Sequence, residues 1–143
     1  MRTVAGELRR ALETTLRRPC ELTCAGRTDA GVHAIAQYVS LPVSEAELAL
    51  PGSRLMRSLC ALTPDDLSVQ ALYRAPAGFS ARFDALSRSY RYRIAASQAR
   101  PVLGWDHSWW YRGELDASAM ARAARPLLGE HDFKSFCKAT SAE

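Results

Sequence analysis

Apolar residues at helical spacing open the chain. The pattern predicts an amphipathic helix over residues 3–18, which needs a sheet on which to lie. Capping and turn signals predict three further helices. They are one turn after Ser44, where a capping-box sequence begins, a helix over residues 53–62, and a helix that Asp116 caps and Gly129 ends.

Alternating apolar and polar residues between the helices predict strands. The expected strands cover residues 20–25, 35–41, 67–73 and 88–95. Helices and strands interleave without the regular spacing of a doubly wound fold. The sequence therefore predicts an α+β fold, with an antiparallel sheet and helices packed on one face.

Length and composition indicate one globular domain. The chain has 143 residues, of which 48% are hydrophobic and 24% charged, as in soluble proteins. No apolar run approaches the ~20 residues that a helix needs to cross a bilayer, so we expect no membrane role. The first residues lack the continuous apolar core of a signal peptide, and the expected location is the cytoplasm.

The charged residues favour a nucleic-acid partner. The net charge is +4, and only two of the nineteen basic residues are lysine. Arginine offers a planar fork of donors that fits phosphate oxygens and stacks on bases. The densest basic cluster is Arg82, Arg88, Arg91 and Arg93. Phosphate contact is the expected role of this group, and a solvated strand face is the alternative.

The cysteines carry no metal-binding pattern. Cys20, Cys24, Cys60 and Cys137 form neither a C-x-x-C pair nor part of a cysteine–histidine set with zinc-ligand spacing. We expect them to be reduced and mostly buried thiols, and we expect no metal ion.

The segment most suggestive of chemistry is the loop between the first two predicted strands. Gly26 and Gly31 bracket a single carboxylate, Asp29, and glycine tolerates the positive φ angles that tight loops need. Arg27 would lie on the same side as Asp29 and favour its ionised form, as a nucleophile or base requires. A turn held by an Arg27–Asp29 ion pair is an equal alternative. A phosphate-binding loop is a third, although the lysine of that motif is missing.

The loop sequence resembles a known family motif. Residues 25–33, read Ala-Gly-Arg-Thr-Asp-Ala-Gly-Val-His, resemble the signature loop of the tRNA pseudouridine synthase A (TruA) family, in which the aspartate is catalytic. A second family motif is similar to residues 79–83 and 87–92, and a third to residues 129–136. All three occur in the family's order. We call residues 25–33 the signature loop and residues 79–92 the second motif.

The resemblance implies a partial pseudouridine synthase fold. Residues 1–143 would form a single partial domain, the N-terminal catalytic half of such an enzyme, with an RRM-like or ferredoxin-like arrangement. The family's first strand would be missing ahead of residue 3, and its C-terminal half after residue 143. An unpaired sheet edge would follow, which predicts poor solubility or self-association.

The resemblance also implies an activity. The family isomerises uridine to pseudouridine in the tRNA anticodon stem-loop, at the thirty-eighth to fortieth nucleotides, and it uses no cofactor. Asp29 would be the catalytic residue, Tyr90 would stack on the flipped uridine, and Arg27 would enter the space that the base leaves. Arg82, Arg88 and Arg91 would contact the RNA, and the full-length protein would be a homodimer.

Two roles remain for the chain. One is the synthase itself, and the alternative is a non-catalytic tRNA-binding fragment that keeps the basic face. Among the other aromatic residues, Tyr92, Trp109 and Trp110 are expected to pack in the core, as aromatic residues on strands usually do, with stacking on RNA bases as the alternative.

Overall fold

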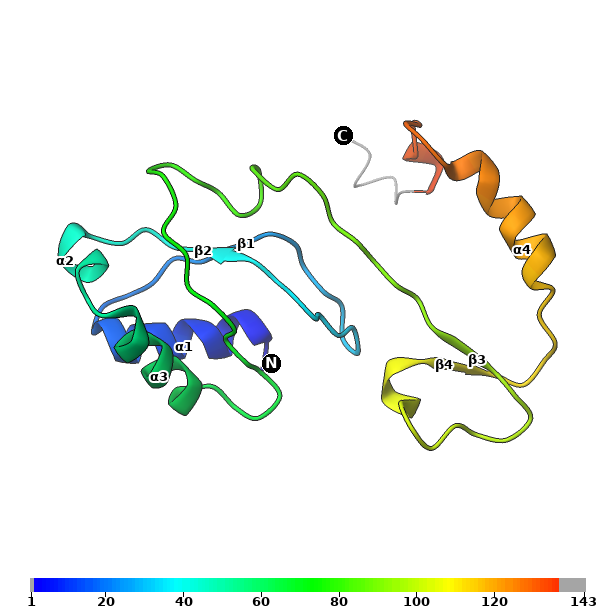
Figure 1. Ribbon diagram of the computed structural model, residues 1–143, viewed down its shortest axis with the longest axis horizontal. Helices are drawn as coiled ribbons and strands as arrows, with labels where there is room; N and C mark the ends of the chain where they lie inside the picture. Colours follow the sequence, from blue (N-terminus) through cyan, green and yellow to red (C-terminus); the bar gives the residue numbers. More distant parts are fainter. Residues whose placement is uncertain (1, 137–143) are drawn as a thin grey trace. The chain divides into compact units, whose positions relative to one another are not determined.

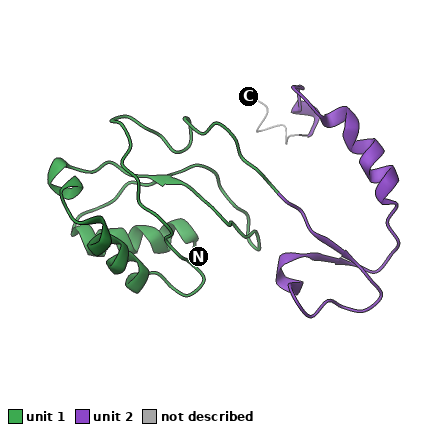
Figure 2. Cartoon of the chain, viewed as in Figure 1, with its two compact units in different colours: residues 1–90 green, residues 91–143 purple. Residues whose placement is uncertain are grey.

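The computed structural model describes residues 2–136, which form two compact units (Figures 1 and 2). The first unit is Met1–Tyr90 and the second is Arg91–Glu143. The first contains helices α1 (Val4–Leu16), α2 (Glu45–Leu48) and α3 (Gly52–Leu62), and strands β1 (Thr23–Cys24) and β2 (Val39–Ser40). The second contains strands β3 (Ile94–Ala96) and β4 (Trp109–Tyr111) and helix α4 (Ala117–Ala124).

The core of the first unit lies between α1 and α3, which run side by side in Figure 1. Its buried residues are Ala11, Leu12, Cys20 and Leu59. Helix α1 begins where the sequence predicts, because the Thr3 hydroxyl accepts a hydrogen bond from the amide of Gly6 at 3.1 Å. The apolar stripe of the first helix therefore faces a partner helix as well as the strands.

Strands β1 and β2 confirm the expected antiparallel pairing. Thr23 pairs with Ser40, and Cys24 pairs with Val39. Leu22 and Leu41, which flank the pair, pack against the helical core. The strands are shorter than predicted, and residues 67–73 are not a strand. Leu67 and Val69 are half-buried and Val69 still packs on the core, but Ala71 and Tyr73 are exposed, so only the start of the alternating pattern corresponds to a packed face.

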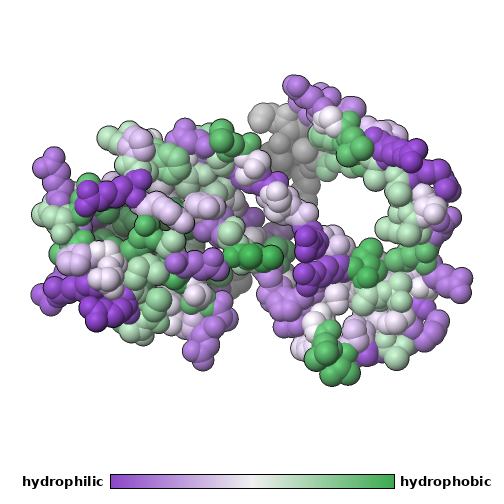
Figure 3. Space-filling view, viewed as in Figure 1, coloured by the Kyte–Doolittle hydropathy of each residue, from purple (hydrophilic) through white to green (hydrophobic). Residues whose placement is uncertain are grey.

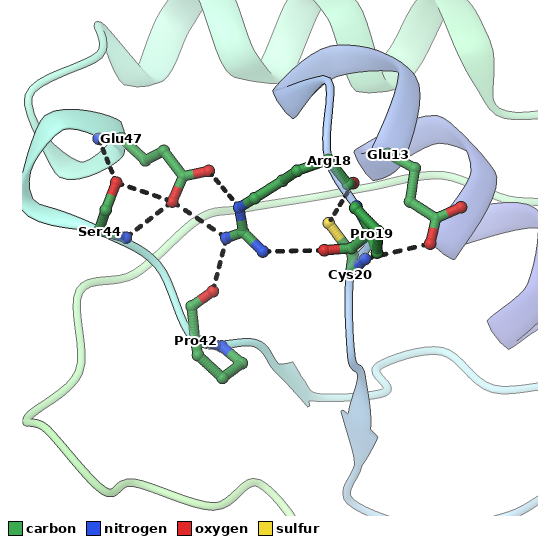
Figure 4. A network of polar contacts seen from close by, with 7 residues as sticks. All are labelled: Glu13, Arg18, Pro19, Cys20, Pro42, Ser44 and Glu47. Atoms are coloured by element: carbon green, nitrogen blue, oxygen red, sulfur yellow. Dashed lines mark hydrogen bonds and ion pairs between the residues drawn. The ribbon is translucent and has the colours of Figure 1, made fainter.

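The short helix α2 is fixed by a polar network around Glu47 (Figure 4). The Ser44 amide donates to Glu47 Oε2 at 2.7 Å, and the Glu47 amide donates to Ser44 Oγ at 3.3 Å, which completes the predicted capping box. Arg18, just after α1, donates from Nε to Glu47 Oε1 at 2.6 Å and from Nη2 to the Pro42 carbonyl at 2.8 Å. One guanidinium thus joins the end of α1 to α2.

The sheet of the second unit is parallel, whereas that of the first unit is antiparallel. Strands β3 and β4 are parallel, with Ile94 opposite Trp109. The sequence predicted only antiparallel pairing. Parallel strands need a crossover connection, and residues 97–108, with a helical turn at Trp105–His107, provide one. The α+β class is confirmed by the helices together with the short antiparallel sheet.

The aromatic residues of the second unit are less buried than expected. Tyr92 is 78% exposed and Trp109 is half exposed, so neither is a core residue here. Trp110 is partly buried, donates from Nε1 to the Ser97 carbonyl at 2.9 Å and lies under the guanidinium of Arg112. None of the described residues from 91 to 136 is buried, and for that reason these rings have no core to enter.

Helix α4 begins as predicted and ends earlier. Asp116 Oδ1 accepts from the Ala119 amide at 2.8 Å, which is the expected cap. The sequence predicted a helix through Leu128, but α4 ends at Ala124 and a single tighter turn covers Arg125–Leu127. Pro126 explains the difference, because it lacks the amide hydrogen that would continue the α-helical hydrogen bonds beyond Arg125. Among the described residues, no helix has both the length and the apolar character to cross a membrane.

Candidate functional site

A tight turn at the centre of the signature loop presents Asp29. The Asp29 carbonyl accepts a hydrogen bond from the Val32 amide at 3.1 Å. Gly31, the third residue of this turn, has a φ of 83°, a value that L-residues rarely adopt and that type II turns require. The expected role of glycine is therefore confirmed at Gly31. Asp29 is exposed, as are all residues of the loop from 27 to 33.

Gly26 has a different role from Gly31. Its backbone is outside the left-handed region, so its conformation does not demand glycine. A Cβ placed there would meet Nε of Arg88 at 3.9 Å, an ordinary van der Waals contact. The sequence does not distinguish the two glycines, but of these two only Gly31 has positive φ.

The base of the signature loop is held by hydrogen bonds across its two arms. The Ala25 amide donates to the Tyr38 carbonyl at 2.8 Å, and Gln37 Nε2 donates to the Gly26 carbonyl at 2.9 Å. On the other side, Arg88 donates to the Ala25 carbonyl from Nε at 2.9 Å and from Nη2 at 2.7 Å. The sequence did not single out Gln37, since its role depends on the loop folding back on itself.

The second motif is joined to the same region. Ala81 is buried, and its amide donates to Ser40 Oγ at 3.0 Å, at the end of β2. Arg88 Nη2 also donates to the Arg82 carbonyl at 2.8 Å. The structure therefore brings the signature loop and residues 81–88 together within the first unit.

The predicted site residues differ in their surroundings. Arg27 is exposed, and the ion pairs of residues 2–136 do not include one between Arg27 and Asp29. A backbone hydrogen bond, rather than the alternative ion pair, closes the turn. No helix begins within residues 25–33, which removes the geometry of a phosphate-binding loop.

Tyr90 and the other arginines are accessible as well. Tyr90 ends the first unit and is 81% exposed. The guanidinium of Arg82 lies 5.4 Å from the ring centre of Phe83, its neighbour. Arg91 begins the second unit and is exposed there.

The described cysteines are free thiols. Cys20 is buried, and burial raises the pKa of its thiol. Cys60 is exposed, in contrast to the expectation of mostly buried cysteines, and Cys137 lies outside the described residues. Residues 2–136 contain no cluster of histidine, cysteine or carboxylate side chains suited to a metal ion.

Comparison with known proteins shows which enzymes the chain resembles. The chain is similar to enzymes that modify RNA, and the relatives carry the name tRNA pseudouridine synthase A. The protein of that name from Streptomyces avermitilis is 43% identical over 142 residues, and the one from Mycobacterium leprae is 42% identical over 155 residues. The one from Caldicellulosiruptor bescii is 35% identical over 140 residues. These similarities confirm the resemblance that the three motifs predicted.

The matches cover nearly all of this chain but a smaller share of each relative. The matches include 96% of this chain for the Streptomyces and Mycobacterium proteins and 98% for the Caldicellulosiruptor protein. The same matches include 50%, 52% and 56% of those relatives. The chain thus spans about half the length of the curated relatives it matches. No family model matches it.

Proposed function

We propose that the chain is part of a tRNA pseudouridine synthase, and that Asp29 is its catalytic carboxylate. The observation that carries the proposal is the placement of Asp29 on an exposed turn whose backbone is set by Gly31 and whose base is anchored by hydrogen bonds. The similarity of the whole chain to tRNA pseudouridine synthases A supports the same conclusion. A positioned carboxylate is suited to act as a nucleophile or a base.

The proposed reaction rearranges one uridine. The bond between the sugar and the ring nitrogen breaks, the uracil turns within the site, and a bond between the sugar and a ring carbon forms. The proton from that carbon is released as the nitrogen gains one, so no atoms or electrons are exchanged with a cofactor. We assign the substrate to uridines of the tRNA anticodon stem-loop, at the thirty-eighth to fortieth nucleotides.

Tyr90 would stack on the flipped base, and Arg27 would fill the space that the base leaves. A uridine paired in a stem must leave the helix before it can react, at a cost of a few kcal/mol. Stacking on an aromatic side chain is worth about 1–3 kcal/mol per base, and the exposed ring of Tyr90 is accessible for it. The exposed guanidinium of Arg27 would occupy the vacated space, and Arg82 and Arg91 would contact the backbone of the RNA.

The same proposal covers the fold, the oligomeric state and the location of the whole enzyme. The chain would be the N-terminal half of the pseudouridine synthase fold, with an RRM-like or ferredoxin-like arrangement, and the whole enzyme would be a homodimer. Because its substrate is tRNA, we assign it to the cytoplasm. A non-catalytic RNA-binding fragment is the second candidate, since the exposed arginines would bind RNA with or without turnover.

The test compares Asp29→Asn with the parent chain. Pseudouridine formation is measured on an unmodified tRNA transcript, both with the 143-residue chain and with the chain joined to any coding sequence that continues it. Asp29→Asn should reduce product to background, because the amide cannot act as a nucleophile or base. RNA affinity should stay roughly constant, because the side chain keeps its size and shape. Equal rates for parent and variant would refute the role of Asp29. Binding without product in every form would favour the RNA-binding fragment.

A further inference from the structure

Arg88 is occupied by the protein's own backbone. Its Nε and Nη2 atoms both donate to the carbonyl of Ala25, 63 residues earlier in the chain, at 2.9 and 2.7 Å. Nη2 donates in addition to the carbonyl of Arg82 at 2.8 Å. The guanidinium therefore bridges the start of the signature loop and the second motif.

This use of Arg88 competes with contact to phosphate. A guanidinium has five N–H groups in a rigid plane, and here the Nε edge and Nη2 are directed at carbonyl oxygens. A bidentate phosphate contact through the same edge would have to break the bonds to Ala25. The sequence predicted that Arg88 contacts RNA, whereas in the structure its contacts are those of a residue that fixes the backbone.

The bridge lies at the point where the signature loop leaves the sheet. The Ala25 amide is bonded to the Tyr38 carbonyl, and the residue that follows, Gly26, lies next to the Arg88 side chain, which a Cβ there would meet at 3.9 Å. From this point the chain continues directly to Asp29. On the other side of the bridge, Tyr90 follows Arg88 by two residues.

We infer that Arg88 is a positioning residue for the reaction, which sets the signature loop and the second motif at a fixed separation. It does so through the carbonyls of Ala25 and Arg82 and does not itself touch the substrate. The catalytic consequence rests on the proposed function, because it assumes that Asp29 and Tyr90 act on one uridine. The bridge itself is independent of that assumption.

Two substitutions separate positioning from phosphate contact. Arg88→Lys keeps the positive charge but loses the planar fork, and Arg88→Met loses both while keeping much of the apolar stem. Arg57→Lys, on the exposed face of α3, is the matched control. The first measurement is amide hydrogen exchange at Ala25 and Val32, compared with Thr63, whose amide bonds to the Leu59 carbonyl at the end of α3.

The expected result is a local effect shared by both variants. Exchange at Ala25 and Val32 should become faster by about tenfold or more in Arg88→Lys and Arg88→Met, as for the loss of charge-assisted hydrogen bonds, with Thr63 and the control unchanged. Unchanged exchange in Arg88→Lys would overturn the inference, because charge alone would then suffice. A uniform increase that includes Thr63 would overturn it too, since Arg88 would then support the whole unit rather than the loop.

Turnover gives the second measurement, in whichever form of the chain makes pseudouridine. A positioning role predicts a lower kcat in both variants with a nearly constant Kd for tRNA. A phosphate contact predicts a normal kcat at saturating tRNA and a Kd that rises in Arg88→Met but not in Arg88→Lys, and this result would overturn the inference. If no form of the unsubstituted chain makes product, whether 143 residues long or extended, the proposed function fails, and hydrogen exchange still decides the role of Arg88.

Discussion

At the scale of single residues, Gly31 determines how the turn below Asp29 is formed. Its φ of 83° is strained for any residue with a Cβ, although nothing lies within 4 Å of where a Cβ would be. Gly31→Ala should therefore destabilise the first unit by about 1–2 kcal/mol through backbone strain alone. Urea denaturation of parent and variant measures the difference in the free energy of unfolding.

Gly26→Ala is the matched control for that experiment. The backbone of Gly26 avoids the left-handed region, and a methyl group there makes only ordinary contact with Arg88. We expect no loss of stability, or a gain of about 0.4–1 kcal/mol from the less flexible unfolded chain. Equal destabilisation by both substitutions would show that the turn does not depend on the φ angle of Gly31.

Glu47 makes stability depend on pH. Hydrogen bonds from Arg18, and then from the Ser44 amide, lower the pKa of Glu47 from 4.5 to about 2. A carboxylate with a lowered pKa in the folded state stabilises it fully above the unfolded value near 4.5, and this contribution is lost as the pH falls toward 2. The parent should therefore lose more stability than Glu47→Gln between pH 6 and pH 3. Glu45→Gln, in the same helix but outside the network, should behave as the parent does.

The residue scale also shows what sequence can and cannot predict about the site. The motif predicted a catalytic role for Asp29, and the tolerance of glycine for positive φ predicted the turn at Gly31. Both predictions depend only on local sequence. The contacts of Arg88 could not be inferred, since they join carbonyls 63 and 6 residues away and any backbone carbonyl has the same chemistry. From the sequence, Arg88 could be recognised only as one member of a basic cluster.

At the scale of elements, helices were predicted better than strands. Thr3, Ser44 and Asp116 each cap a helix through a local hydrogen bond, so the sequence alone contains the signal. Strand length depends on a partner elsewhere in the chain, which explains why the pattern over residues 35–41 became only Val39–Ser40. The early end of α4 was within reach of the sequence, because Pro126 marks it.

Leu59 is the largest fully buried side chain among the described residues. It is 1% exposed on α3 and belongs to the cluster that also contains Ala11 and Leu12 of α1. Leu59→Ala should lower the free energy of unfolding of this unit by about 2–5 kcal/mol, because it leaves a cavity in addition to the lost burial. Urea denaturation with Leu62→Ala as the control tests this, since Leu62 ends the same helix and is partly exposed. Similar losses for both would place the core elsewhere.

At the scale of the whole molecule, the two units differ in how far each is stabilised by its own core. Every buried apolar residue among the described residues lies in the first unit. The second unit relies on strand pairing and on ring contacts such as those of Trp110. Sequence periodicity shows which residues are able to be buried, but not whether enough partners are present to bury them. For this reason the core positions predicted for Tyr92 and Trp109 were wrong.

Large apolar side chains remain exposed in both units, and Figure 3 shows hydrophobic residues reaching the surface in each. Ile35 is 85% exposed in the first unit and Leu103 is 93% exposed in the second. Exposed apolar surface on this scale is unusual for a monomer and favours association. We therefore expect the 143-residue chain to self-associate, with a mean mass that rises with concentration in sedimentation velocity experiments.

Charge placed in these apolar regions should weaken the association. Ile35→Lys and Leu103→Lys each interrupt exposed apolar surface, whereas Ala123→Lys adds the same charge at an exposed site of α4 that carries no large apolar group. If apolar contact drives assembly, the first two variants should shift toward monomer at a given concentration and the third should match the parent. An equal shift in all three would mean that net charge controls the association, because repulsion between like-charged chains does not depend on where the lysine is placed. A parent chain that stays monomeric at all concentrations would contradict the expectation from exposed apolar surface.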